Sequence, residues 1–307
     1  MHTAYITHPF CHKHDNGPDH PECAARLSAI EDQLIACGLY DYLQHHEASP
    51  ASREQLLRVH DAAYLDWLEA AIPAEGLVYL QDDIVLCPMT LKAALHAAGA
   101  VVNGVDLVMR GAAANVFCAI RPPGHHAMRN RAMGFCIFNN IAVGAAHALV
   151  QHGLERVAIV DFDVHHGNGT EAIVRDDARI LFCSTFQHPF YPGCGVDSAN
   201  AHVINVPLAA GTDGEVFRQA VSEHWLPALH AFRPQLLLIS AGFDAHQEDD
   251  MAMLRLKESD YAWVTGEISM IADSYAGGRI VSALEGGYAI SALARSAVAH
   301  IKVLAGV

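Results

Sequence analysis

The stretch RVAIVDFDVHHGNGT, residues 156–170, joins an apolar run to a cluster of polar side chains. The run Arg156–Asp161 has the pattern of a β-strand buried on both faces, because its apolar residues are continuous and several are β-branched. Carboxylates, imidazoles and glycines follow it directly. In open α/β sheets, ligands bind beyond the carboxyl ends of the strands. The stretch therefore predicts a buried strand of an α/β fold and a functional site at its end.

Four further apolar runs have the same character. They are Asn115–Ile120, Arg179–Cys183, Gln235–Ser240 and Arg279–Leu284. Longer segments with a helical pattern separate them, which indicates crossover helices between parallel strands. No repeat, low-complexity tract or linker interrupts the chain. We therefore expect residues 1–307 to form a single domain with a central, mostly parallel sheet flanked by helices.

Two local signals predict where helices begin. Thr212 and Glu215 have the spacing of a capping box. Pro21 lies where a first-turn proline is expected for a helix over Ala24–Ile35.

Composition limits the class of protein. The chain has 307 residues with 19 basic and 34 acidic side chains, and its formal net charge is −15. This balance argues against nucleic-acid binding, which needs a basic surface. The N-terminus lacks the features of a secretory signal, and no uncharged apolar run reaches the ~18 residues of a membrane span. The eight cysteines form no C-x-x-C pair, so we expect reduced thiols in a cytoplasmic protein without a membrane segment.

The pair Asp163-x-His165 predicts a metal site, because residues two apart on an extended backbone point to the same side. Asp244, beyond another predicted strand, would complete an Asp/His/Asp set. Three protein ligands leave a position open, as in catalytic zinc sites, although the same donors also admit Fe²⁺ or Co²⁺. The alternative, that Asp163 and His165 only cap a helix, is disfavoured by Asp161 before them and the G-N-G sequence after them.

A tandem pair, His125-His126, follows the sequence R-P-P-G at the end of a predicted strand. Adjacent histidines in a loop are commonly surface residues, but this position favours a function. An imidazole beside a metal site needs an orienting acceptor, and Asp161 and Asn168 are the candidates. A carboxylate partner would keep one ring more strongly charged, while an amide partner would leave the other nearer its ordinary pKa.

Tyr288 follows two glycines at the end of the last predicted strand. Its O–H would be able to donate to a developing oxyanion, although a tyrosine in such a place is more commonly a packing residue. Phe135, after Gly134, is expected either to line an access slot or to belong to the core.

The motifs RPPGHH, GFCIFNN, DFDVHHGNGT, SAGFDAH and LEGGY, in this order, resemble those of the zinc-dependent histone deacetylase superfamily. The resemblance extends from about Tyr5 to about Val303. HHGNGT and LEGGY resemble the class II branch, which includes bacterial deacetylase homologues. The resemblance implies an arginase-like three-layer α/β fold. It also implies hydrolysis of an N-acetyl amide, on the ε-amino group of a lysine or on a small polyamine-like amine.

The resemblance implies a role for each matching residue. The zinc ligands would be Asp163, His165 and Asp244. His126, oriented by Asn168, would act as general base and then general acid. His125, held by Asp161, would give electrostatic support, and Tyr288 would donate to the substrate oxygen.

Substrate and potassium sites are also implied. The Gly134 carbonyl would accept from the substrate amide, and Phe135 would flank the acyl-lysine channel. The substrate-binding set is completed by Tyr191 and Met251. K⁺ would bind near the zinc, at Asp161, Asp163, His165 and Ser184. Members of the superfamily often form homodimers or homotetramers.

Departures from the family pattern bear on the substrate. Met251 stands where a polyamine-preferring member has a glutamate, which disfavours polyamines. The acidic residues Glu248, Asp249 and Asp250 would still be able to attract a cationic ligand. An acetylpolyamine amidohydrolase is therefore the main alternative. An arginase-like two-metal enzyme lacks bridging aspartates beyond Asp244, and a non-catalytic acetyl-lysine binder would not need the complete catalytic set.

Overall fold

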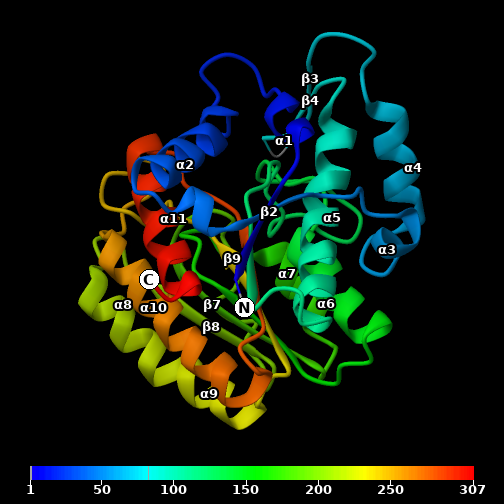
Figure 1. Ribbon diagram of the computed structural model, residues 1–307. Helices are drawn as coiled ribbons and strands as arrows, with labels where there is room; N and C mark the ends of the chain where they lie inside the picture. Colours follow the sequence, from blue (N-terminus) through cyan, green and yellow to red (C-terminus); the bar gives the residue numbers. More distant parts are fainter. Residues whose placement is uncertain (1, 82) are drawn as a thin grey trace.

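The computed structural model describes residues 2–81 and 83–307. The strands of its main sheet are β1 (Thr3–Thr7), β2 (Gln44–Glu47), β5 (Asn115–Cys118), β6 (Val157–Asp161), β7 (Ile180–Gln187), β8 (Val203–Leu208), β9 (Leu236–Ala241) and β10 (Ile280–Leu284). They lie in the order β2-β1-β5-β10-β9-β6-β7-β8, and each pair of neighbours is parallel. A separate antiparallel hairpin joins β3 (Val78–Tyr79) to β4 (Val85–Leu86). Figure 1 shows the course of the chain.

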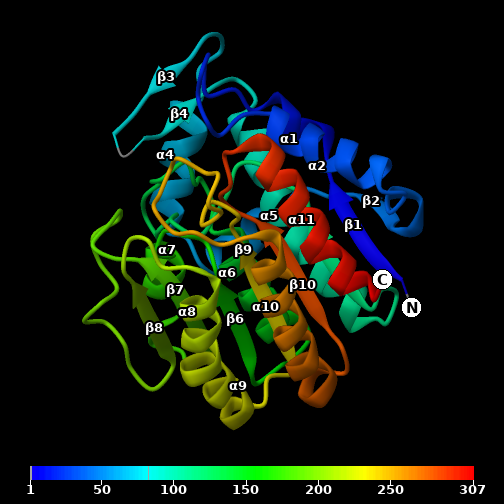
Figure 2. The same ribbon diagram turned by 90° about the vertical axis from the view of Figure 1, so that its left-hand side faces the viewer.

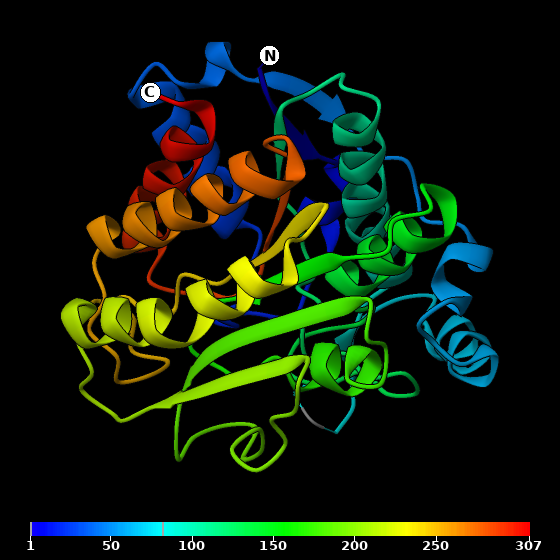
Figure 3. The same ribbon diagram turned by 90° about the horizontal axis from the view of Figure 1, so that it is seen from below.

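Helices cover both faces of the sheet, as Figure 3 shows from below. One layer contains α2 (Ala25–Ala36), α8 (Gly214–Ala220), α9 (Leu226–Phe232), α10 (Glu258–Ile271) and α11 (Ile290–Ala305). The other contains α1 (Pro9–Lys13), α5 (Thr90–Met109), α6 (Asn140–Gln151) and α7 (Asn168–Val174), with α3 (Arg53–Leu57) and α4 (Ala62–Ala71) outside them. The three-layer α/β fold expected from the sequence is therefore confirmed.

The core lies on both sides of the central strands. Every residue of β6, β7, β9 and β10 is buried, which explains why their sequences are nearly continuous apolar runs. The eight cysteines form no disulfide within the described residues, and five of them are buried.

α5 is the helix of the described chain that is long and apolar enough to cross a membrane by length and composition alone. Lys92 and Asp106 interrupt its apolar sequence. Most of the helix is buried, since it packs between α6 and the sheet. This environment is that of a core helix.

The ends of two helices differ from the predictions. α8 is capped by Asp213, whose carboxylate accepts the N–H groups of Glu215 and Val216. The prediction of Thr212 as the cap was wrong because an aspartate one residue later makes these bonds. The helix predicted over Ala24–Ile35 is present as α2 (Ala25–Ala36), but Pro21 lies before its first turn.

β7 is longer than predicted, and this changes the place of Ser184. The strand continues to Gln187 because residues beyond Cys183 pair with β8. Ser184 therefore lies inside the strand rather than after it. It is the register neighbour of Asp161 in β6.

Candidate active site

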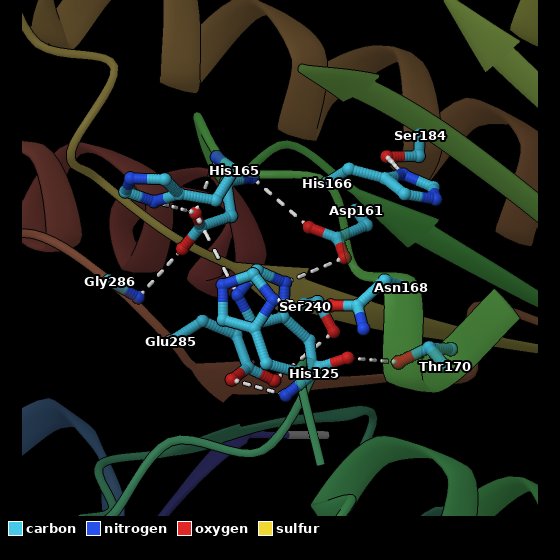
Figure 4. A network of polar contacts seen from close by, with 12 residues as sticks. His125, Asp161, His165, His166, Asn168, Thr170, Ser184, Ser240, Glu285 and Gly286 are labelled. Atoms are coloured by element: carbon cyan, nitrogen blue, oxygen red, sulfur yellow. Dashed lines mark hydrogen bonds and ion pairs between the residues drawn. The ribbon is translucent and has the colours of Figure 1, made fainter. Parts of the chain in front are cut away.

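The predicted site residues converge at the carboxyl ends of adjacent strands in the middle of the sheet. β5, β10, β9 and β6 are consecutive in the sheet order. They are followed, respectively, by His125-His126, Tyr288, Asp244, and Asp163 with His165. Figure 4 shows His125, Asp161, His165 and Glu285 around one centre. Side chains up to 163 positions apart in the sequence are thus brought together by the parallel topology.

Asp163, His165 and Asp244 form a compact, buried group. His165 Nδ1 lies 3.2 Å from Asp163 Oδ1 and 3.2 Å from Asp244 Oδ2. Main-chain donors hold both carboxylates: Gly286 N–H donates to Asp163 over 2.8 Å, and Val164 N–H donates to Asp244 over 2.9 Å. One potential ligand atom from each residue lies within 4.8 Å of the others. The carboxylates are therefore fixed in position with a ring nitrogen between them.

The electrostatics of this group favour a cation. Burial and the neighbouring Asp163 carboxylate raise the pKa of Asp244 to about 6. Burial alone would lower the pKa of His165, but its hydrogen bonds to Asp163 and Asp244 outweigh burial and raise it to about 10. Two carboxylates and one imidazole in a dry site are a donor set that suits Zn²⁺. The residues thus fit the metal that the sequence predicted.

The tandem histidines make the two contacts proposed for them. His125 Nδ1 lies 3.0 Å from Asp161 Oδ2, and His126 Nδ1 lies 2.8 Å from Asn168 Oδ1. An amide oxygen only accepts, so Nδ1 of His126 carries the hydrogen and its Nε2 presents a lone pair. His126 is thereby prepared to accept a proton at Nε2.

The two rings differ in charge because their surroundings differ. Burial disfavours a charged His125, but the carboxylates of Asp163 and Asp161 outweigh it and raise its pKa to about 10. Burial and the neighbouring rings of His125 and His165 lower the pKa of His126 well below its usual value. His125 is thus the cationic member of the pair, and His126 is the neutral one.

Glu285 supports the pair from below, a role that the sequence analysis did not assign. Its carboxylate accepts the N–H groups of Gly124 over 2.7 Å and of His125 over 3.1 Å. Ser240 Oγ donates to its other oxygen over 3.2 Å. Glu285 directly follows the buried apolar strand β10. A charged residue at such a position is the sequence signal that would have indicated its role.

Asp249 is a second support that the sequence analysis missed. The sequence indicated that it would be able to attract a cationic ligand, but it is buried. Its Oδ2 accepts the N–H groups of Tyr288 over 2.6 Å and of Ala289 over 3.0 Å, and its Oδ1 accepts that of Met251 over 3.1 Å. One carboxylate therefore fixes two residues that face the substrate cavity. Its position within a run of acidic residues concealed this role.

Arg26 holds the segment before Tyr288 from the opposite side. Its Nε donates to the Gly287 carbonyl over 2.7 Å, and its guanidinium lies 5.1 Å from the centre of the Tyr288 ring. Glu22 anchors Arg26, with 3.1 Å between the charged atoms, and is also paired with Arg121. All three charged side chains are buried. Burial raises the pKa of the Tyr288 phenol well above its usual value, so the phenol remains a donor.

A cavity of about 210 Å³ opens above the metal-binding group. It is lined by Asp83, His126, Gly134, Phe135, His165, Phe190, Tyr191, Met251 and Tyr288. The four predicted substrate-binding residues are therefore brought to one place. Gly134 has φ +55°, and a Cβ there would overlap the His126 ring, so the backbone passes directly against the proposed base.

A second group of metal-capable side chains lies away from this cavity, on α5 and the end of α6. Nε2 of His147 and Nε2 of His152 each lie 2.8 Å from Asp106 Oδ1. Arg58 Nη1 lies 3.2 Å from His147 Nδ1. Because arginine only donates, that Nδ1 accepts and the Nε2–H of His147 is directed at Asp106. Hydrogen bonds between the side chains thus account for this group.

The chain is similar to proteins of one family along most of its length. Residues 20–304 match the family described as "Histone deacetylase domain". A histone deacetylase-like amidohydrolase from Pseudomonas aeruginosa is 40% identical over 296 residues, covering 94% of this chain and 76% of that protein. The human protein named polyamine deacetylase HDAC10 is 35% identical over 309 residues, covering 94% of this chain and 46% of that protein.

A solved structure shares the fold. The crystal structure of the HDA15 HD domain matches with a TM-score of 0.94 at 32% sequence identity, covering 99% of this chain and 90% of that one. The agreement extends over the parallel sheet and both helical layers.

Proposed function

The chain belongs to the histone deacetylase family and is a hydrolase of amide bonds, and from this premise we propose that it removes acetyl groups from the ε-amino group of lysine in peptides or proteins. The observation that carries the proposal is the cavity where His126, His165 and Tyr288 meet below apolar walls. Phe135 and Met251 belong to those walls. A narrow apolar channel with polar groups at its base fits an unbranched alkyl chain that ends in a neutral amide.

Zinc is the typical cofactor of the family. We propose that Asp163, His165 and Asp244 hold Zn²⁺, and the same donors would admit Fe²⁺ or Co²⁺. When bound, the ion would supply Lewis-acid polarisation of the acyl carbonyl and would lower the pKa of water. We also propose K⁺ near Asp161 and Ser184, which are neighbours across β6 and β7.

The chain's own residues move the proton and stabilise charge. His126 Nε2 takes a proton from the attacking water and later returns it to the leaving amine, while Asn168 holds its Nδ1–H. His125 stays cationic through Asp161 and favours negative charge on the reacting oxygen. The Tyr288 O–H donates to the oxyanion that develops on the acyl group.

The acidic residues near the channel favour lysine over a polyamine. Asp249 is buried against main-chain N–H groups, and Glu248 is paired with Arg295 at 2.7 Å. The Asp249 carboxylate is therefore not available to the second ammonium group of a polyamine, and that of Glu248 already has a cationic partner. One observation supports the alternative of an acetylpolyamine amidohydrolase: Asp83, an exposed carboxylate, lines the cavity.

A substrate panel tests the proposal. Zinc-loaded protein would be given acetyl-lysine peptides, N-acetylputrescine and peptides with longer acyl groups, and the released acid would be measured. We expect the highest kcat/KM on acetyl-lysine peptides. Turnover of N-acetylputrescine alone would favour the alternative, and no release from any acyl amine would refute both.

A further inference from the structure

A second cavity of about 320 Å³ lies beside the proposed channel. We name it the side groove and define it by its apolar lining of Trp67, Leu80, Ile84 and Ala132. The polar residues Gln81 and Asn130 and the basic residue Arg131 also line it. The groove lies where α4, the β3–β4 hairpin and the loop before Gly134 meet. Figure 2 shows this hairpin projecting from one corner of the molecule.

The side groove and the channel share two thin walls. In the first wall, Leu80 N–H donates to the Ile84 carbonyl over 2.8 Å. Ile84 lines the groove, while the adjacent Asp83 lines the channel. In the second wall, Ala132 lines the groove and Gly134 lines the channel. Two residues span at most about 7 Å of backbone, so only a thin wall separates the two cavities.

The thin wall places the side groove within reach of an extended peptide that is bound at the channel. Side chains at positions i and i+2 of an extended chain point to the same side and are separated by about 7 Å. A peptide whose acyl-lysine enters the channel therefore directs a side chain two positions away toward the side groove. A small acylated amine has no such side chain.

Trp67 presents a rigid aromatic surface to the groove. Its side chain is 46% exposed. It stacks on Tyr64, with ring centres 5.9 Å apart and an interplanar angle of 24°. Tyr64 is buried, and its O–H donates to the Ile137 carbonyl over 2.7 Å. An aromatic ring that is held in place before binding gains contact area with little loss of conformational entropy.

We propose that the side groove is a substrate subsite that binds an apolar side chain two residues from the acyl-lysine. This inference rests on the proposed lysine deacetylase function. It narrows the substrate class to acylated peptides or protein segments with an apolar residue at that spacing. Free acylated amines have no such side chain and are unable to contact the side groove.

Matched peptides test the subsite. Each would carry one acetyl-lysine with either leucine or glycine two positions before or after it. We expect the wild-type protein to show a kcat/KM roughly five- to ten-fold higher for a leucine peptide, as for partial burial of one apolar side chain. Trp67→Ala should bring this ratio close to one while leaving turnover of N-acetylputrescine or free Nε-acetyl-lysine unchanged.

Met270→Ala is the matched control, because Met270 is 55% exposed on α10 and lines neither cavity. It should retain the wild-type ratio. Equal rates on leucine and glycine peptides in the wild type would overturn the inference. So would an unchanged ratio in Trp67→Ala, or a loss that is equally large on the small substrates.

Binding measurements separate this inference from the proposed function. If the wild-type protein released no acetate from any peptide, the lysine deacetylase proposal would fail. The affinities of fluorescently labelled leucine and glycine peptides for the wild-type and Trp67→Ala proteins would then decide the matter. A leucine preference that Trp67→Ala abolishes supports the subsite, and equal affinities overturn it.

Discussion

Among the described residues, two groups of aspartates and histidines have metal-capable geometry, and one of them lies at the base of the candidate active site. In the Asp163, His165 and Asp244 group, every side chain is buried and main-chain N–H groups hold the carboxylates. In the second group, the Asp106 side chain is 30% exposed. His147 and His152 direct their Nε2 atoms at one of its oxygens.

The difference shows what a metal centre requires beyond the right residue types. In the first group, main-chain N–H groups hold two buried carboxylates, and the His165 ring nitrogen lies between them. In the second group, the Nε2–H of His147 satisfies the carboxylate itself, and Arg58 adds a positive charge nearby. The distances between the ligand atoms alone do not identify a cation site. Burial of the side chains and hydrogen bonds from the main chain to the carboxylates distinguish it from a partly exposed, hydrogen-bonded cluster.

Removing a ligand should produce the largest difference between the two groups. Asp163→Ala should lose bound zinc and lower deacetylase activity by at least about a thousand-fold, because both ligation and Lewis-acid chemistry are lost. His152→Ala should retain both. Metal content and acetate release would be measured on the same samples. Zinc retained by Asp163→Ala would contradict our ligand set, and zinc lost from His152→Ala would contradict the distinction.

Removing the proton carrier should have the next largest effect. His126→Ala should lower kcat by about 10²- to 10⁴-fold while zinc remains bound, because the general base is lost. Tyr288→Phe should lower it by about 10²- to 10³-fold through the missing oxyanion donor. His147→Ala, a histidine of the second group, is the control and should keep wild-type turnover. Equal losses in His126→Ala and His147→Ala would show that fold damage, and not chemistry, is being measured.

Changing the support of Tyr288 should have an intermediate effect. An asparagine at position 249 has one oxygen and is unable to accept all three N–H groups that Asp249 accepts. The loss of one such bond predicts about a ten-fold lower kcat for Asp249→Asn. In a Tyr288→Phe background the same substitution should cost less, because the two residues act together.

Asp250→Asn is the control for this experiment, since its carboxyl group is exposed next to Asp249. It should leave kcat unchanged. Fully additive losses in the double variant would show that Asp249 does not act through Tyr288.

The second group should affect stability only, and only slightly. Burial alone would raise the pKa of Asp106, but hydrogen bonds from His147 and His152 outweigh it and lower the pKa. A carboxylate with a lowered pKa stabilises the fold above its unfolded pKa of about 3.9, and this contribution is lost as the pH falls below that value.

Asp106→Asn should therefore reduce the free energy of unfolding by about 0.5 kcal/mol at pH 7, allowing for the partial exposure of the pair. Urea unfolding at several pH values would measure this difference, which should shrink below about pH 4. A difference that grows in acid would contradict the assigned sign. Activity at pH 7 should not change.

The sequence predicted the strands that are buried on both faces. β6, β9 and β10 lie within one residue of their predicted bounds, and β5 begins at the predicted Asn115. Three strands of the main sheet were not predicted, nor was the β3–β4 hairpin. β2 and β8 are edge strands with alternating or mixed burial, and β1 has only three apolar residues between two threonines. Such strands lack the continuous apolar sequence that identified the others.

Site residues were predicted where a motif ends a strand, and missed where support comes from a distant loop. The contacts of His125 with Asp161 and of His126 with Asn168 were expected from the sequence and are present. The role of Asp249 was not predictable from the sequence. Its carboxylate accepts hydrogen bonds from main-chain N–H groups, which every residue except proline has, and not from complementary side chains. Arg26 reaches Gly287 across 261 positions of sequence, a contact that only the fold creates.

The segment from Glu285 to Tyr288 contacts three parts of the site within four residues. Glu285 holds the tandem histidines, Gly286 donates to Asp163, and Tyr288 faces the channel. These contacts come from neighbouring residues. An insertion or deletion of one residue would therefore displace the carboxylate that holds the tandem histidines, the N–H group that holds Asp163 and the phenol of Tyr288 together. The length of this segment is therefore fixed by the three contacts that it makes at once.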